Sequence, residues 1–304
     1  MNRAYLMLIS AVFLWGLTVV PMKWTLDTVQ PFTLMFFRLL LAGLLLLPLV
    51  WLRRGRVSGK AVAIPWMRLA MLSFTGVAGY FLMNTYGISL TSGVNASIIS
   101  ATLPLFTLLL AALYLKEQIL LTQWVGLVLG IGGVLMVTIQ PQSLQQAHSL
   151  WGDFLVLASQ FIWTVYVVQL KRPKGEEKLS SELFTALTFL LGSAMLLPFA
   201  AWETWHFGLP SASGKSVMSF LFLVLCCTML AYLMWNKALE RIPAAKAGIY
   251  LNAIPLLNVL TSILLLSEQM SWRTIVGGLL VLVGVAWAER RKHARGLVRA
   301  KLDA

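Results

Sequence analysis

Two tryptophans, Trp15 and Trp163, are the side chains of this sequence best suited by type and position to bind a ligand. Each lies near the centre of a long apolar run. A tryptophan at that depth usually needs a hydrogen-bond partner for its indole N–H, and its π face suits apolar, aromatic or cationic ligands. We therefore expect both to line a cavity for a small organic molecule. Close packing between two parts of the protein is the alternative.

Polar side chains near the tryptophans extend this candidate cavity. Gln160 and Tyr166 lie three residues before and after Trp163, so in a helix all three share one face. An amide in an apolar run is costly unless it faces water or a partner, and such side chains should point inward. Hydrogen bonding between helices is the alternative for any one of them. The other expected lining residues are Tyr80, Asn84, Trp235, Asn236 and Asn252.

Arg38 is the one charged residue that falls firmly inside an apolar run. It follows Pro31 by seven residues, which in a helix is about 10 Å from the start of the run. A guanidinium at that depth must find carbonyls, water or an anionic group. Arg38 is therefore predicted either to bind a carboxylate of a ligand, or to pair with helix ends or snorkel outward and so hold the extracellular side together.

Residues for catalysis or metal binding are missing from the centres of the runs. The acidic residues nearest to them, Asp153, Glu182, Glu203 and Glu289, lie near run ends, and the three histidines lie in connections or in the tail. The two cysteines are adjacent in sequence, which excludes an ordinary disulfide between them and gives no zinc spacing. We expect no enzyme activity, no metal and no cofactor.

The composition predicts a protein embedded in lipid. The 304 residues are 59% hydrophobic and 12% charged, with a mean hydropathy of +0.81, whereas a soluble protein carries about a quarter charged residues. About 20 apolar residues span a bilayer as a helix. Ten candidate spans follow, the first of them a retained helix and not a signal peptide: 4–22, 31–51, 66–86, 94–114, 121–139, 151–170, 182–202, 216–238, 244–266 and 272–288.

The sequence contains an internal duplication. Five residues recur 151 positions later in the same order, and Trp15 recurs as Trp163 at an offset of 148. Each copy holds five spans, and because five is odd the second copy must enter the membrane upside down. Inverted repeats of this kind are an architecture of secondary transporters, with the substrate held near the midplane between the halves. The recurring residues are Pro104, Glu117, Gln118, Gly126 and Gly133, which become Pro255, Glu268, Gln269, Gly277 and Gly284.

Lysine and arginine predict the orientation. With a cytoplasmic N-terminus, twenty of these residues fall on the cytoplasmic side and three on the external side. The positive-inside rule therefore places both termini in the cytoplasm. The net charge of +13 follows mainly from this bias, so nucleic acid is not an expected partner. Residues 1–140, 141–289 and 290–304 are predicted to be the first repeat, the second repeat and a basic cytoplasmic tail.

The duplicated motif itself is expected to be mechanical. Pro104 and Pro255 each remove a helix hydrogen bond and are candidate hinges. Glu117 and Glu268 each precede a helix, where a carboxylate caps unpaired N–H groups. The glycines that begin at Gly126 present a face that lets another backbone approach closely. That backbone belongs either to the other repeat or to a second chain in a homodimer.

These residues also resemble a known family. Leu14-Trp15-Gly16, the Pro31 to Arg38 spacing, Pro104, and Glu117 with its following glycines are similar to the drug/metabolite transporter superfamily, and more narrowly to its EamA-type ten-helix members. The resemblance covers essentially the whole chain. It implies an all-α membrane protein, with ten helices around a central cavity, that moves small metabolites, including amino acids, across a bacterial inner membrane.

The sequence therefore predicts an exporter of small organic metabolites that works by alternating access. The missing deep carboxylate favours transport down the substrate's own gradient over proton antiport. A membrane receptor or assembly subunit that transports nothing, and an uptake permease of the same fold, are the alternatives.

Overall fold

The protein is described here from a computed structural model that places residues 3–54, 66–115, 120–139, 147–169, 180–211, 213–239, 241–242 and 250–302. Every regular element among these residues is helical. The first half contains α1 (Arg3–Gly16), α2 (Val19–Leu26), α3 (Pro31–Arg54), α4 (Trp66–Ser73), η1 (Phe74–Gly79), α5 (Tyr80–Leu90), α6 (Gly93–Ser100), α7 (Leu103–Leu115) and α8 (Leu121–Thr138). The second half contains α10 (Ala147–Gln169), α11 (Ser181–Phe207), α12 (Gly214–Phe222), η2 (Leu223–Leu230), α13 (Ala231–Leu239), α15 (Ala253–Leu266) and α16 (Trp272–Leu302).

Seven helical segments of the described chain are long and apolar enough to cross a membrane. They match the first, second, fourth, fifth, sixth, seventh and eighth of the ten expected spans. The third region is helical as α4, η1 and α5, and the last two regions contain the shorter apolar helices Ala253–Leu266 and Trp272–Ala288. The protein is thus a multi-pass helical membrane protein, and the number ten stays a prediction.

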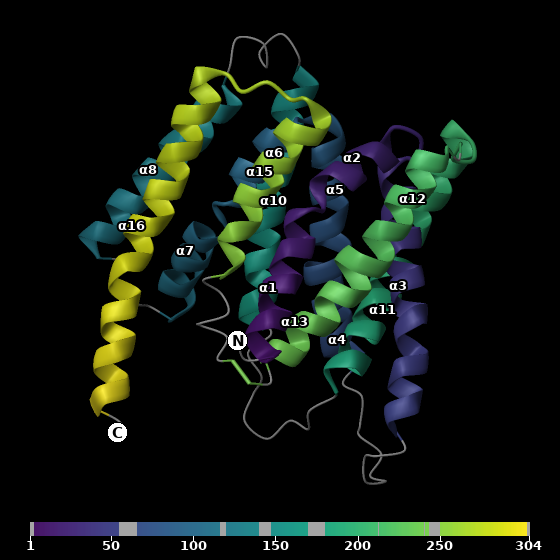
Figure 1. Cartoon of the computed structure of the whole chain (residues 1–304), viewed down its shortest axis with the longest axis horizontal. Helices are drawn as coiled ribbons and strands as arrows, with labels where there is room; N and C mark the ends of the chain where they lie inside the picture. The colour runs from purple at the N-terminus through teal and green to yellow at the C-terminus, as the bar shows by residue number, and fades with distance from the viewer. Residues whose placement is uncertain are drawn as a thin grey trace.

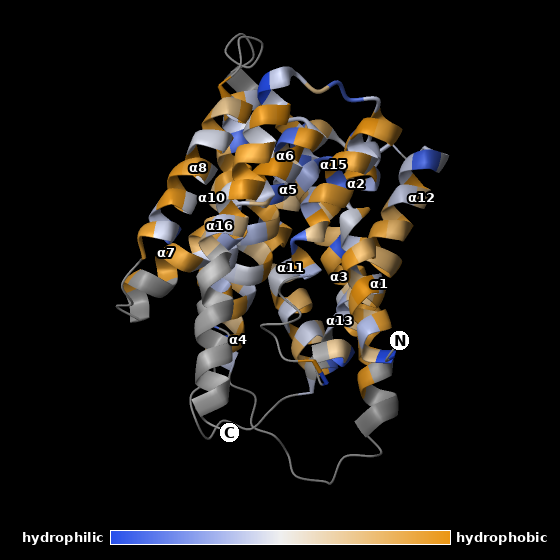
Figure 2. Ribbon diagram, turned by 60° about the vertical axis from the view of Figure 1, so that its left-hand side comes forward, coloured by the Kyte–Doolittle hydropathy of each residue, from blue (hydrophilic) through white to orange (hydrophobic). Residues whose placement is uncertain are grey.

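The apolar surface fits this environment. Figure 2 shows hydrophobic residues along most of the length of α1, α8 and α12, with polar residues gathered near the upper end of the bundle. Large apolar side chains on the outside, such as Leu121, Val128 and Leu264, are more than half exposed. α1 begins and α16 ends toward the same, lower end of the bundle (Figure 1). The side of the membrane that this end faces stays a prediction.

Two helices of the first half pack along their own sequence copies in the second half. α8 packs along α16 at one edge of the molecule, and α3 packs along α11 at the other (Figure 1). Likewise α1 packs on α13 and α10 packs on α5, which are the same contact with the two halves exchanged. Such exchange of partners is what a two-fold relation between the copies predicts.

Glycine contacts between α8 and α16 are reciprocal in detail. A Cβ atom on Gly126 would lie 2.5 Å from the carbonyl oxygen of Gly284, and one on Gly284 would lie 2.6 Å from that of Gly126. For Gly133 and Gly277 the two distances are 2.5 and 2.7 Å. Only glycine lets the backbones approach this closely. The predicted close-packing face of α8 therefore contacts the other repeat, and not a second chain, at these positions.

Both halves contain a π-helical segment at a related place. η1 ends immediately before Tyr80, and η2 ends two residues before Tyr232, which is the sequence copy of Tyr80. A π-helix changes the register of the helix and is frequent at functional sites. Nothing in the sequence pattern predicted these segments.

The two motif prolines lie just after breaks in the helices and not inside continuous ones. Pro104 is the second residue of α7, after the turn at Ala101 and Thr102, and Pro255 is the third residue of α15, after the turn at Asn252. In a first helical turn the missing proline N–H would have no helical partner in any case. A break in the helix thus precedes each proline, so neither proline removes a hydrogen bond from the interior of a continuous helix. Whether these positions act as hinges stays a prediction.

Candidate functional site

The two candidate tryptophans each contact a tyrosine that belongs to the opposite repeat. The ring of Trp15 in α1 lies 5.2 Å from the ring of Tyr232 in α13. The ring of Trp163 in α10 lies 4.8 Å from the ring of Tyr80 in α5. Since Trp163 is the copy of Trp15 and Tyr232 is the copy of Tyr80, these are one contact made twice with the halves exchanged. We call these four residues the paired aromatic cluster.

The first pair is anchored to the π-helical segment η2. The indole N–H of Trp15 donates to the backbone carbonyl of Cys227 at 3.0 Å. The Cys227 thiol in turn donates to the carbonyl of Leu14 at 3.3 Å. Trp15 also contacts Trp235, with 5.4 Å between ring centroids. The N–H that the sequence analysis required to find a partner is therefore paired across the two repeats.

The second pair is extended by Tyr166 and bordered by η1. The rings of Trp163 and Tyr166 lie 5.0 Å apart, and the ring of Tyr166 packs so closely on Gly76 that a Cβ there would overlap it. Tyr166 also lies near Tyr232 of the first pair. Aromatic residues from both pairs therefore belong to one connected group.

Two of the amide side chains predicted to point inward, those of Asn84 and Gln160, are buried and paired with serines. Nδ2 of Asn84 donates to Oγ of Ser159 at 3.2 Å. Nε2 of Gln160 donates to Oγ of Ser100 at 3.3 Å and to Oγ of Ser159 at 3.2 Å. Gln160 also shares a side-chain hydrogen bond with Tyr80. This chain ties α5, α6 and α10 together beside the second aromatic pair.

Arg38 lies between the two aromatic pairs. Its side chain is 3% exposed, and its Nε donates to Oγ1 of Thr228 in η2 at 2.7 Å. The guanidinium lies 5.5 Å from the ring centroid of Phe81 and interacts electrostatically with Tyr80 and Tyr232. Arg38 thus does not extend to the bundle surface. Its sequence-aligned residue in the second half, Thr188, donates its hydroxyl to carbonyls of its own helix.

The remaining predicted residues are less closely joined to this group. Asn252 precedes α15 and makes no side-chain cap there, but it has an interaction partner. The side chain of Asn236 and the whole of Glu117 lie outside the described residues. Residues that sequence reasoning did not select are Ser100, Ser159, Thr228 and Phe81, which carry no signal in the sequence beyond being polar or aromatic within apolar runs.

Glu268 caps a helix, but not the one that follows it. Its carboxylate accepts hydrogen bonds from the N–H groups of Gly93 at 2.7 Å and Val94 at 2.8 Å, at the start of α6 in the other repeat. The helix after Glu268, α16, is instead capped by Ser271, whose Oγ accepts from the N–H of Thr274 at 3.1 Å. The chain between α15 and α16 brings Glu268 back over the first repeat, which is why a local prediction missed its target.

Glu203 makes a second cap between the repeats. It lies in α11 and accepts from the backbone N–H of Thr33 at 2.7 Å and from the hydroxyl of Thr33 at 3.0 Å, in the first turn of α3. A carboxylate at a helix N-terminus pairs with N–H groups that have no helical acceptor and meets the positive end of the helix dipole. Two helices of the first repeat therefore begin on carboxylates supplied by the second.

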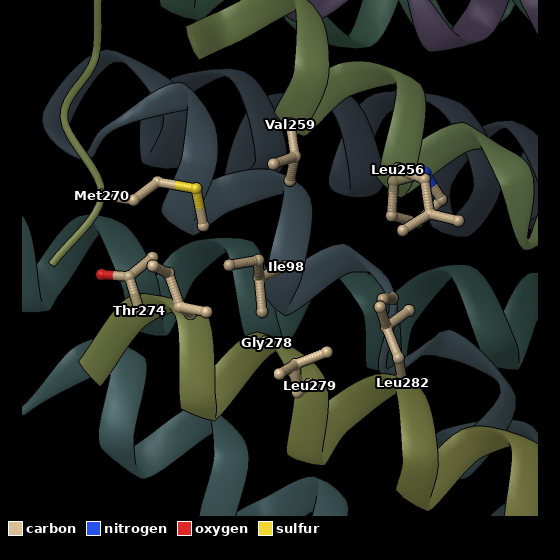
Figure 3. Close-up of a pocket in the computed structure, with 11 residues that line it drawn as sticks. Ile98, Leu256, Val259, Met270, Thr274, Gly278, Leu279 and Leu282 are labelled. Atoms are coloured by element: carbon tan, nitrogen blue, oxygen red, sulfur yellow. The ribbon is translucent and has the colours of Figure 1, made fainter. Parts of the chain in front are cut away.

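A pocket of about 160 Å³ lies apart from the aromatic group (Figure 3). It is lined by residues of α6, α15 and α16 such as Ile98, Val259 and Leu282. Its rim includes Leu256 and Leu279, which are each about half exposed. Pro255 is the one candidate residue in its lining. The pocket is an apolar crevice at the side of the bundle, and it contains none of the paired aromatic residues.

The sequence matches the model of the EamA-like transporter family over residues 2–139 and again over residues 150–289. Together these matches cover most of the chain. The protein belongs to the EamA-like transporter family. It is therefore a membrane transporter of the drug/metabolite superfamily and not an enzyme.

Named relatives agree with the family. An uncharacterized transporter of Archaeoglobus fulgidus is 27% identical over 295 residues, covering 96% of this chain and 99% of that protein. The uncharacterized transporter YetK of Bacillus subtilis is 26% identical over 289 residues, covering 93% of this chain and 85% of its own length. A solved crystal structure superposes with a TM-score of 0.64 at 20% identity and covers 99% of both chains. The two proteins therefore share one fold over nearly their whole length.

Proposed function

We propose that this EamA-family protein exports small organic metabolites, amino acids or similar amphipathic solutes, and that it binds them at the paired aromatic cluster. The observation that carries the proposal is the reciprocal contact of Trp15 with Tyr232 and of Trp163 with Tyr80. Each contact joins the two repeats. A solute held between these four rings would therefore touch both halves at once.

Alternating access gives this arrangement a mechanism. In transporters built from inverted repeats, one half rocks against the other around a site near the midplane. Both aromatic pairs cross between the repeats, so such a motion would change the spacing between the rings that bind the solute. The helix breaks before Pro104 and Pro255 are proposed to absorb the motion, since each leaves a short, non-helical joint.

The setting of the protein is proposed from its relatives and its charge pattern. We place it in a plasma membrane, the inner membrane of a bacterial cell, with ten spans, both termini in the cytoplasm, and the repeats divided at residue 140. Buried carboxylates at Asp153, Glu182 and Glu203 lie inside the protein. Glu203 is occupied as a helix cap, Asp153 accepts from the hydroxyl of Thr91 and from Nδ2 of Asn95, and Glu182 also has an interaction partner. We therefore propose transport without a proton-coupling carboxylate in the binding site. A homodimer of such units is compatible with the proposal, and nucleic acid has no part in it.

An uptake permease of the same fold is the second candidate, because nothing in the paired cluster distinguishes the direction of transport. A receptor without transport activity would leave no purpose for contacts that are repeated across both halves. A resistance screen separates these functions. Cells that overproduce an exporter should survive toxic analogues of its substrates, cells that overproduce an uptake permease should become more sensitive to them, and cells with a receptor should show neither effect.

The screen uses a panel of toxic amino-acid analogues, aromatic acids and lipophilic cations. Cells carrying the empty vector and cells expressing Trp163→Ala at equal membrane abundance are the controls. Resistance to at least one class that Trp163→Ala abolishes supports the proposal. No change of tolerance across the whole panel would contradict export of these solutes.

A further inference from the structure

Arg38 is buried, and no carboxylate is recorded beside its charge in the part of the chain that the structure describes. The residue is 3% exposed, and among the described residues its Nη1 has no hydrogen-bond partner. The groups recorded around it are the hydroxyl of Thr228, the ring of Phe81, and the neutral groups of Cys227, Tyr80 and Tyr232. A buried cation that lacks a counter-charge is expensive for the fold.

A purely structural role explains only part of this arrangement. The Nε contact with Thr228 joins α3 to η2, which a neutral donor such as glutamine could also do without the cost of a buried charge. Snorkelling to the membrane surface does not apply, because the guanidinium is enclosed by side chains from α5, η2 and α13. No recorded interaction within the described part of the protein therefore requires the positive charge of Arg38.

The position of Arg38 suits the binding of an anionic ligand. Arg38 lies over the ring of Phe81, which lies 5.1 Å from the ring of Tyr80. It also donates to Thr228, the neighbour of Cys227, whose carbonyl accepts the indole N–H of Trp15. An anion that reaches Arg38 therefore lies close to both Trp–Tyr pairs. A guanidinium presents parallel N–H groups that match the two oxygens of a carboxylate. We propose that Arg38 binds the carboxylate of the transported molecule, and that the apolar part of this molecule lies against Trp15 and Trp163.

This inference rests on the proposed function and narrows its substrate class to organic carboxylates with an apolar or aromatic group. The inference also predicts the orientation of the bound substrate. The residue that matches Arg38 in the second half is Thr188, whose hydroxyl donates to backbone carbonyls of α11. A site with one cationic pole between two equivalent aromatic pairs binds its substrate in a single orientation, although the scaffold around it is repeated.

The test measures flux into liposomes that contain the purified full-length protein, using mass spectrometry and matched pairs of compounds. Phenylalanine, leucine and 3-phenylpropionate carry a carboxylate, while phenylalaninol and leucinol carry a hydroxymethyl group in its place. We expect flux of at least one carboxylate above that of protein-free liposomes and a preference of at least tenfold over its alcohol. Arg38→Gln should lower the carboxylate flux at least tenfold, and Arg38→Lys should lower it less. Thr188→Val is the matched control and should keep the wild-type flux.

The outcomes separate this inference from the function on which it depends. If no compound of the panel moves faster than in protein-free liposomes, the proposed substrates are wrong and this inference falls with them. If alcohols move as fast as carboxylates, or if Arg38→Gln transports carboxylates at the wild-type rate, transport stands and the role of Arg38 is wrong.

Heat unfolding, measured without substrate, tests whether Arg38 has a merely structural role. Arg38→Met removes the buried charge but keeps a long apolar side chain, so the midpoint of heat unfolding of the purified variant should equal or exceed that of the wild type. A clearly lower midpoint for Arg38→Met, together with a loss of flux for every substrate including the alcohols, would show that Arg38 holds the fold together and would overturn the proposal.

Discussion

At the scale of single residues, carboxylates that cap helices across the repeat boundary are a main stabilising feature. Glu268 accepts two backbone N–H groups of α6, and Glu203 accepts a backbone N–H and a hydroxyl in the first turn of α3. Lys23 reinforces the first of these contacts, since it interacts electrostatically with Glu268 and donates its ammonium to the carbonyl of Thr91. These bonds link the repeats at one end of the bundle.

Removing one cap should measurably destabilise the protein. Glu268→Ala leaves the N–H groups of Gly93 and Val94 without their acceptor, which should cost about 1–2 kcal/mol and lower the midpoint of heat unfolding. The neighbouring Gln269 is exposed, so Gln269→Ala should leave the midpoint unchanged. Equal midpoints for the two variants would show that the carboxylate does not support α6.

The sequence predicted part of this chemistry at the residue scale and missed the rest for a physical reason. The duplication singled out Trp15, Trp163 and Glu268, because a repeated residue is visible in one chain. Their partners are not visible, since Trp15 meets Tyr232 and Glu268 meets α6 only after the two halves fold onto each other. Local rules assign a cap to the nearest helix, and here the nearest helix already has Ser271.

At the scale of helices, the seam between α8 and α16 depends on glycine at specific positions. Gly133 faces the carbonyl of Gly277, whereas a Cβ on the adjacent Gly132 would have no atom within 4 Å. The two glycines are therefore adjacent in sequence, but only Gly133 lies in the contact between the helices. The glycine spacing predicted a close approach, but only the packing identifies which glycines take part.

This pair provides a matched test of the seam. Gly133→Ala should push α8 and α16 apart and lower the unfolding midpoint, with a cost of about 1–3 kcal/mol for overpacking. Gly132→Ala should leave the midpoint unchanged or raise it, because alanine favours a helix over glycine by up to about 1 kcal/mol. Heat unfolding of both purified variants checks the prediction. A larger loss for Gly132→Ala than for Gly133→Ala would contradict this packing.

Helix breaks and π-helical segments were the features least accessible from the sequence. The apolar run at 94–114 looks continuous, yet the structure divides it into α6 and α7 at Ala101 and Thr102. η1 and η2 have ordinary membrane-helix compositions. Hydropathy measures how apolar a stretch is and not how its backbone hydrogen bonds are arranged, so it predicts where a span lies and not where the span is interrupted.

At the scale of the whole molecule, the number of spans that the sequence predicts determines the expected topology. Ten spans, five in each repeat, would put both termini on the same side, as the charge bias predicts. We therefore expect a green fluorescent protein fused after Ala304 to fluoresce in bacterial cells and an alkaline phosphatase fused there to stay inactive. The opposite pattern would contradict ten spans with a cytoplasmic N-terminus.

We propose that the solute is bound between the paired aromatic residues and moved across the membrane. Flux into liposomes by Trp163→Ala tests it most directly, because Trp163 contacts Tyr80 of the opposite repeat. Trp124→Ala is the control, since Trp124 is 52% exposed on α8, away from the cluster. At equal protein content, flux should be abolished in Trp163→Ala and kept in Trp124→Ala. Wild-type flux in Trp163→Ala would show that solute is not bound between the paired aromatic residues.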